Sequence, residues 1–437
     1  MALFPQEALN DGVRKREVFG WAMYDFANSG YTTVVLTAVF NAYFVSVAAN
    51  NAQWATLAWT LAMGLSSLIV MLSMPAIGAY ADLRAAKKRL LMFTTAGCVI
   101  STLALAWVGQ GDVALAFAAI VVSNIFYAYG ESLTAAFLPE LARRESMGRV
   151  SGWGWSFGYF GGMLSLGLCL AYVLWAQGQG IPATQFVPVT MIITAAVYGT
   201  ASLATFALLP ERAVPQAAVE ATGGGVGAAL RRLGQTWQRA REHVDFVWLL
   251  ACGSAYQAGI SVVIALAAVY AEQVLGFKQA ETMMLVFLVN IAAALGAFIF
   301  GAYQDRVGHK SALALTLFGW IVMTVLAAVA QSATLFWVAA VIAGLCMGSS
   351  QSAGRAMAGA LAPRLQLAEF FGLWTFATRL AAIIGPVTYG LVTWLTRGNH
   401  RLAIASTAVF FVIGLVLLIP MNVQRGVAAA KARGGGH

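Results

Sequence analysis

The chain has 437 residues, of which 60% are hydrophobic and only 10% are charged, and its mean hydropathy is +0.77. Because soluble domains carry about 25% charged residues, this composition excludes an ordinary soluble protein and indicates a protein embedded in a membrane. The formal net charge of +9 fits the basic loops of a membrane protein, so we expect no nucleic-acid partner.

Twelve apolar runs are each long enough to cross a bilayer, since a spanning helix needs about 20 mostly apolar residues. Residues 1–18 are expected to form a cytoplasmic segment and not a cleavable signal, because the first apolar run is too long for a signal core. Six spans are predicted within 19–209, at 19–47, 55–81, 89–109, 113–139, 150–175 and 187–209. Six more are predicted within 246–422, at 246–275, 280–303, 310–330, 334–363, 369–396 and 401–422. Residues 210–245 are expected to link the two groups, and residues 423–437 to form a tail.

Lys and Arg indicate how these spans are oriented. If the N-terminus is cytoplasmic, only Lys278, Arg397 and Arg401 lie outside and two arginines lie within spans, which leaves 21 of the 26 basic residues inside. This bias is the positive-inside rule, so both termini are expected in the cytoplasm. As a separate expectation, the protein is placed in a bacterial cytoplasmic (inner) membrane. The linker carries an apolar stripe that predicts an amphipathic helix on the inner leaflet, either tethering or regulating the halves.

An internal repeat relates the two groups of spans. The loop "GAYADLRAAKKR" after the second span resembles "GAYQDRVGHK" after the eighth, so that Gly78 and Asp82 recur as Gly301 and Asp305. Two groups repeated in the same order are typical of two-bundle secondary transporters. The sequence therefore predicts an all-α integral membrane protein of twelve transmembrane helices, in two six-helix bundles related by pseudo-two-fold symmetry.

Both loops resemble the signature loop of the major facilitator superfamily, a glycine and an aspartate followed by basic residues such as Arg306. Within it, "WAMYDFANSGY" at 21–31, "AEFFGLW" at 368–374 and "GP" at 385–386 resemble the vacuole-effluxer-like (autophagy-related amino-acid effluxer) family and its bacterial relatives. The resemblance implies the major facilitator fold and alternating access. It also implies gates at Gly78, Asp82, Gly301, Asp305 and Arg306, with Asp82 facing the eleventh span and Asp305 the fifth.

Four ionisable residues stand inside predicted spans: Asp25, Glu131, Arg355 and Arg379. At about 1.5 Å per residue, all four lie at a similar depth from the cytoplasmic ends. The repeat maps Glu131 onto Arg355, so these two are expected to face each other across a cavity; a purely structural ion pair is the alternative. Because arginine stays charged and suits carboxylate or phosphate, Arg355 and Arg379 are candidate anchors for an anionic group. Asp25 and Glu131 are candidate proton-coupling groups.

Polar and aromatic residues near these charges are candidate substrate contacts, although each could equally serve helix packing. They are Asn28, Gln351, Tyr24, Tyr31, Tyr127, Tyr159, Tyr256, Gln257, Trp374 and Thr378. Asn28 and Gln351 stand out because each lies about one helical turn from a buried charge.

The predicted function is secondary active transport of a small polar, zwitterionic or anionic solute, such as an amino acid or small peptide, with proton coupling as a candidate mechanism. The alternatives are export of a larger anionic metabolite or amphiphilic drug, and a membrane sensor that no longer transports. The sequence has no nucleophile–base arrangement or phosphate-binding loop, so no enzyme activity is expected. Scattered histidines and cysteines predict no metal site and no cofactor. Expected partners are the substrate, protons and membrane lipid, and we expect a monomer.

Overall fold

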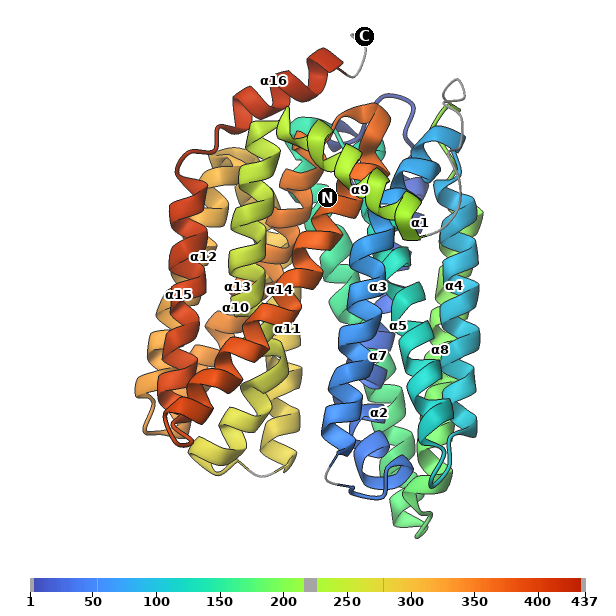
Figure 1. The fold of residues 1–437 in the computed structure, drawn as a ribbon, viewed down its shortest axis with the longest axis vertical. Coiled ribbons are helices and arrows are strands. Elements are labelled where there is room, and N and C mark those ends of the chain that lie inside the picture. Colours follow the sequence, from blue (N-terminus) through green and yellow to red (C-terminus); the bar gives the residue numbers. More distant parts are fainter. Residues whose placement is uncertain (1–3, 53, 216–225, 278, 434–437) are drawn as a thin grey trace.

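The computed structural model describes residues 4–52, 54–215, 226–277 and 279–433, and these residues fold into long, roughly parallel helices without a β-strand (Figure 1). Within these ranges, twelve helices are long and apolar enough to cross a membrane. The prediction of an all-α, twelve-helix membrane protein is therefore confirmed. Apart from the helices, a single isolated bridge pairs Leu9 with Ala142.

The first span is irregular. It begins with α1 (Lys15–Gly30), continues through two π-helical stretches, η2 (Tyr31–Ala38) and η3 (Phe44–Ala48), and has α2 (Phe40–Tyr43) between them. Threonine hydroxyls compete for backbone carbonyls here, as when Thr37 donates to the oxygen of Thr32 at 2.9 Å. Such π-helical turns are rare and frequently occur at functional sites.

The other elements of the first half are long helices joined by short ones. They are η1 (Gln6–Ala8), α3 (Ala55–Arg84), α4 (Lys87–Ala104), η4 (Leu105–Trp107), α5 (Val113–Ala135), α6 (Leu138–Leu141), η5 (Arg144–Ser146), α7 (Met147–Gly178) and α8 (Ala183–Leu208).

The second half repeats this pattern after a linker helix. Its elements are α9 (Val226–Arg241), α10 (Val244–Leu275), α11 (Gln279–Val307), α12 (His309–Val329), α13 (Ala333–Leu361), η6 (Arg364–Gln366), α14 (Leu367–Leu395), α15 (His400–Leu418) and α16 (Val423–Arg433). The helix α16 occupies a segment that was expected only as a tail. It is tied to α10 by Arg425, whose guanidinium donates two hydrogen bonds of 2.8 Å to Asp245.

The two halves meet mainly at one end of the molecule. In Figure 1 this end is uppermost, and both ends of the chain, α9 and α16 lie toward it; we call it the termini face and the other end the opposite face. There α3 packs on α14, and α11 packs on α7. A side chain on Gly78 would overlap the carbonyl of Ala368, and one on Gly301 would overlap the carbonyl of Gly148. These glycines let helices from different bundles approach closely.

Candidate functional site

A buried ion pair joins the two bundles. Arg355, on α13, donates a hydrogen bond of 2.6 Å from Nη1 to Oδ2 of Asp25, on α1. Their side chains are only 8% and 12% exposed. Arg355 also donates to the hydroxyl of Ser151 at 3.2 Å and to its carbonyl oxygen at 2.8 Å. Arg355 thus makes three hydrogen bonds to the N-terminal bundle.

Aromatic rings flank the same guanidinium. The guanidinium carbon, Cζ, of Arg355 lies 4.8 Å from the ring centroid of Trp21 and 5.2 Å from that of Trp155. Cation–π contacts of this kind stabilise a desolvated arginine. Gly154 lies so close to both Arg355 and Asp25 that a methyl group there would overlap both side chains.

A second ion pair joins the bundles but is more open. Arg379, on α14, donates to Oε2 of Glu131, on α5, at 3.2 Å. The arginine side chain is 17% exposed and that of Glu131 is 41% exposed. Glu131 also lies within electrostatic range of Asp25 and Arg355. The four charges therefore form one group, and the Glu131 side chain is the most exposed member of it.

The predicted pairing of Glu131 with Arg355 is wrong, because each residue reaches a different helix of the opposite bundle. The amide of Glu369 donates to Asp82, and the amide of Arg149 donates to the related Asp305. Arg379 lies ten positions after Glu369, and Tyr159 lies ten after Arg149, so Arg379 and Tyr159 occupy related places in the two bundles. Arg379 supplies the positive charge that Glu131 requires. Tyr159 offers Arg355 no negative charge, and the carboxylate of Asp25 on α1 supplies it.

Four other predicted contacts lie beside these charges. Gln257 donates to the side-chain oxygen of Gln351 at 2.7 Å, one turn from Arg355, and both residues belong to the C-terminal bundle. Asn28 is buried on α1, where its side-chain oxygen accepts a hydrogen bond of 3.5 Å from Ser29. Tyr159 packs against Trp155 with ring centroids 5.9 Å apart.

Several predicted substrate contacts lie inside a single bundle. The hydroxyls of Tyr24 and Tyr198 are 3.1 Å apart, and Tyr31 bonds Ser123 at 2.7 Å. Tyr127, one turn before Glu131, stacks on Tyr31 at 5.2 Å.

In the C-terminal bundle, the ring of Trp374 packs against Gly253 and Gly354, and Tyr256 is fully buried beside Gly354. The hydroxyl of Thr378 donates to the carbonyl of Thr375 on its own helix. Among the described residues, no hydrogen bond, ion pair or ring contact joins the four charged side chains to Tyr24, Tyr31, Tyr256, Trp374 or Thr378.

Two aspartates close the termini face in a symmetric manner. Asp82, at the end of α3, accepts hydrogen bonds from the amides of Ala368 at 3.1 Å and Glu369 at 2.9 Å, in the first turn of α14. Asp305, at the end of α11, accepts from the amides of Gly148 and Arg149, both at 2.9 Å, in the first turn of α7. The first-turn amides of a helix have no partner within it, and the helix dipole favours an anion there. Both contacts join the helices that the resemblance implied.

Arg306 follows Asp305 and has an exposed side chain, so its predicted gating role is not explained by a contact in this conformation. On α7, the inter-bundle hydrogen bonds of Ser151 and Ser156 lie within the first third of the helix. The structure is thus closed at the termini face.

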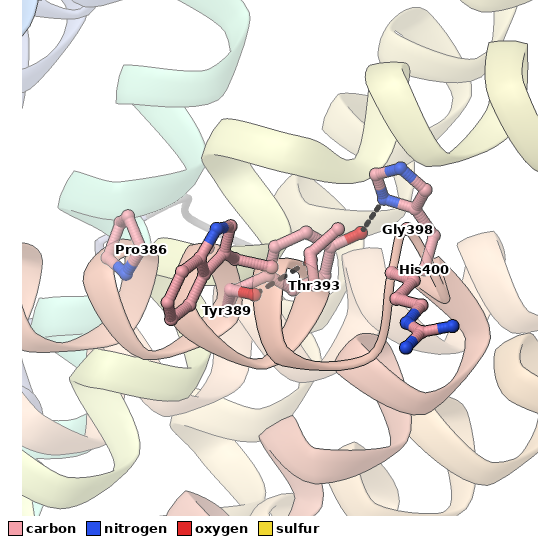
Figure 2. A pocket seen from close by; sticks show the side chains of 8 residues that line it. Pro386, Tyr389, Thr393, Gly398 and His400 are labelled. Carbon is pink, nitrogen blue, oxygen red and sulfur yellow. Dashed lines mark hydrogen bonds between the residues drawn. The ribbon is translucent and has the colours of Figure 1, made fainter.

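A shallow pocket lies at the opposite face, along the last turns of α14 and the start of α15 (Figure 2). Its lining is Pro386, Tyr389, Gly390, Thr393, Trp394, Arg397, Gly398 and His400. The Tyr389 hydroxyl and the Nδ1 atom of His400 are 2.9 Å apart, which joins the two helices. This pocket is on α14 beyond Arg379 and does not contain the charged group.

Sequence reasoning missed the residues that hold Arg355 in place. Ser151, Gly154 and Trp21 carry no charge, and hydropathy alone does not distinguish them from packing residues. The signal that could have found two of them is "SGWGW" at 151–155, a run of small and aromatic residues. Small residues allow helices to pack closely in membranes, and here they make room for the ion pair.

Comparison with known proteins agrees with this architecture. A family model described as "Vacuole effluxer Atg22 like" matches residues 55–431. The chain is 28% identical over 405 residues to YxiO of Bacillus subtilis (strain 168), described as an uncharacterized MFS-type transporter, covering 91% of this chain and 93% of that protein. It is 29% identical over 221 residues to autophagy-related protein 22-1 of Penicillium rubens, covering 47% of this chain and 37% of that protein.

Solved structures with the same fold are also transporters. The human organic anion transporter MFSD10 (TETRAN) superposes with a TM-score of 0.73 at 15% identity, covering 92% of this chain and 99% of that chain. A bacterial homologue of the iron transporter ferroportin, in an outward-facing state, gives a TM-score of 0.69 at 12% identity, covering 93% of this chain and 98% of that chain. At these identities the likeness establishes the fold.

Proposed function

Because the chain belongs to the vacuole effluxer Atg22-like family and has the fold of major facilitator transporters, we propose that it carries a small zwitterionic or anionic organic solute by alternating access. The observation that carries this proposal is the second ion pair. Glu131 and Arg379 come from different bundles, offer one negative and one positive group, and are more exposed than the pair of Asp25 and Arg355. An amino acid or small peptide carries the complementary pair of charges.

In this proposal, the substrate replaces the ion pair between Glu131 and Arg379 by binding both side chains. Its carboxylate binds the guanidinium of Arg379, whose planar donors suit a carboxylate, and its ammonium group binds Glu131. Because the two anchors belong to different bundles, a bound zwitterion connects the halves and favours their rocking together. Gln351, Gln257 and Tyr159 border the arginine group and would contact the remainder of the substrate.

The buried pair has a different proposed role. Asp25 is the proton-coupling residue, because protonation would neutralise it and break its charge-assisted bond to Arg355. Arg355 would then be released to hold the substrate's anionic end, and the bundles would lose a tie between them. Glu131, the more accessible acid, would exchange protons with the cavity.

The proposal also covers the orientation, location and oligomeric state of the protein. We propose that the termini face is cytoplasmic, from the bias in basic residues, and that the protein resides as a monomer in a bacterial inner membrane. The conformation described here would then be outward-facing, with Asp82 and Asp305 holding the cytoplasmic side shut.

Binding to the purified protein tests the substrate class. A panel of neutral amino acids, dipeptides, dicarboxylates and amphiphilic cations is screened by thermal shift and titration calorimetry. A zwitterion should bind wild type, and Arg379→Ala should weaken its binding at least tenfold, while Arg397→Ala, at the opposite face, leaves it unchanged. Preference for an amphiphilic compound without any effect of Arg379→Ala would contradict the proposal.

A second candidate is export of a larger organic anion. The rings of Trp21 and Trp155 around Arg355 favour it, because aromatic surfaces beside an arginine suit amphiphilic anions. In the same panel this alternative predicts binding that depends on Arg355 and Trp155 and does not require an ammonium group.

A further inference from the structure

The motif "AEFFGLW" at 368–374 contacts several helices in addition to the gating residue Asp82. Its first two amides bind Asp82. The carbonyl of Phe371 accepts a hydrogen bond of 3.2 Å from Ser132 on α5, and Gly372 packs directly on Pro75 of α3. The first turns of α14 are thus bound to the N-terminal bundle at several points.

The side chain of Glu369 has a separate set of partners on the linker helix α9. Its Oε1 atom accepts a hydrogen bond of 2.6 Å from the hydroxyl of Thr236. The guanidinium of Arg239 lies 3.4 Å from the same oxygen. Glu369 and Thr236 are only 3% and 2% exposed, so this contact is buried.

The linker helix also contacts the other side of the gate. α9 packs on α3, the helix that ends with Asp82, and on α14, the helix that Asp82 binds. Just after α9, the ring of His243 packs edge-on against Phe370 of the motif, with centroids 5.3 Å apart. The linker therefore crosses the junction between the bundles at the termini face.

We propose that α9 is a latch on this gate, in which Thr236 and Arg239 are positioning residues that act on the Asp82 contact through Glu369. The inference rests on the proposed alternating access. The backbone amide of Glu369 donates to the carboxylate of Asp82. The Glu369 side chain places a second carboxylate near the first. Because like charges repel, that side chain must be neutralised by partners, and α9 supplies a hydroxyl and a guanidinium.

Release of the latch would weaken the closed state for two reasons. The Glu369 carboxylate would remain buried without its partners, which is costly, and its charge would oppose that of Asp82. Both effects are relieved when the bundles separate at the termini face. The linker thereby sets the resting balance between the two conformations and is more than a tether.

The test measures the distance between the bundles at the opposite face. Gln179, after α7, and Gln331, before α13, are exposed positions for a pair of spin labels, and the four native cysteines are buried. When the termini face opens, this pair should move together. Thr236→Val removes the hydroxyl at similar volume, Arg239→Gln removes the charge, Thr236→Ser keeps the hydroxyl, and Gln238→Ala is an exposed control on the same helix.

We expect Thr236→Val and Arg239→Gln each to raise the short-distance population at least threefold at unchanged thermal stability, with Thr236→Ser and Gln238→Ala like wild type. The latch is wrong if neither variant shifts the distances while Asp82→Asn does, and this outcome leaves the gate and the proposed transport intact. If Asp82→Asn also has no effect, the gate itself is refuted, and the latch with it. Should Thr236→Val fold poorly, Arg239→Gln decides, because Arg239 is 53% exposed.

Discussion

At the scale of single residues, two acid–arginine pairs of similar chemistry differ in their surroundings. Asp25 and Arg355 are buried and share their site with Ser151 and two tryptophan rings. An isolated carboxylate at the centre of a membrane costs about 2.5–3.5 kcal/mol on insertion scales, so Asp25 depends on its partner. Glu131 is 41% exposed, so losing its partner should cost less free energy than it does for Asp25.

This difference predicts that the two arginine substitutions destabilise the protein to very different extents. Arg355→Ala leaves Asp25 buried and unpaired and should destabilise the protein by about 3–5 kcal/mol. Arg379→Ala should cost about 1 kcal/mol, because the Glu131 side chain that it leaves unpaired is 41% exposed, although it weakens substrate binding at least tenfold. Thermal unfolding in detergent measures both, and Asp25→Asn combined with Arg355→Ala should recover part of the loss. Equal destabilisation by the two single substitutions would show that burial does not distinguish the pairs.

At the scale of elements, the gates depend on helix ends. Each gating aspartate accepts two amide hydrogen bonds from the first turn of a helix in the other bundle, and Gly78 and Gly301 permit the approach. Hydrogen bonds to a charged group contribute about 1.5–3 kcal/mol. Loss of that charge therefore shifts the balance between conformations by a large factor.

Asp82→Asn should favour opening of the termini face, because an amide side chain cannot accept from both amides as a carboxylate does. Transport should fall at least tenfold while substrate affinity changes less than threefold, since the binding pair is untouched. Flux assays and calorimetry on the same preparation measure the two quantities. A parallel loss of both, together with poor expression, would instead indicate a role in folding.

Gly301→Ala provides a matched test at the other gate. A methyl group there would overlap the carbonyl of Gly148, so the closed contact between α11 and α7 should be lost without any change of charge. Gly390→Ala, at a glycine with open space around it, is the control. We expect transport to fall strongly only in Gly301→Ala, and similar activity of the two variants would argue against close packing as part of the gate.

At the scale of the whole molecule, the proposed orientation places the termini face in the cytoplasm. Gly180→Cys, after α7, should then react with an impermeant maleimide added outside intact cells. Glu145→Cys, at the start of the same span, should react only after the membrane is made permeable. Labelling with the reverse pattern would invert the topology and make the structure inward-facing.

Some of this architecture could be predicted from the sequence and some could not. Some patterns are local in the sequence and could be read from it directly. Hydropathy predicted the spans, the repeated loop predicted the two-bundle fold, and the motifs around Asp25 and Glu369 predicted the family. The partner of Arg355 depends on which helices meet across the bundles. The repeat relates Glu131 to Arg355 in sequence, yet Glu131 pairs with a residue of α14 and Arg355 with a residue of α1. Uncharged residues such as Ser151 and Gly154, which position the pair, give no charge signal in the sequence.

The most direct test of the central claim is solute uptake into proteoliposomes, with and without an imposed pH gradient, using a zwitterion that binds the purified protein. The account predicts that wild type accumulates the solute when the gradient is present. Asp25→Asn should still exchange internal for external solute but should fail to accumulate it. Wild-type transport that ignores the gradient, together with an Asp25→Asn variant that behaves identically, would contradict the proton-coupling role of Asp25. Absence of any exchange by wild type would contradict the transport of such a solute.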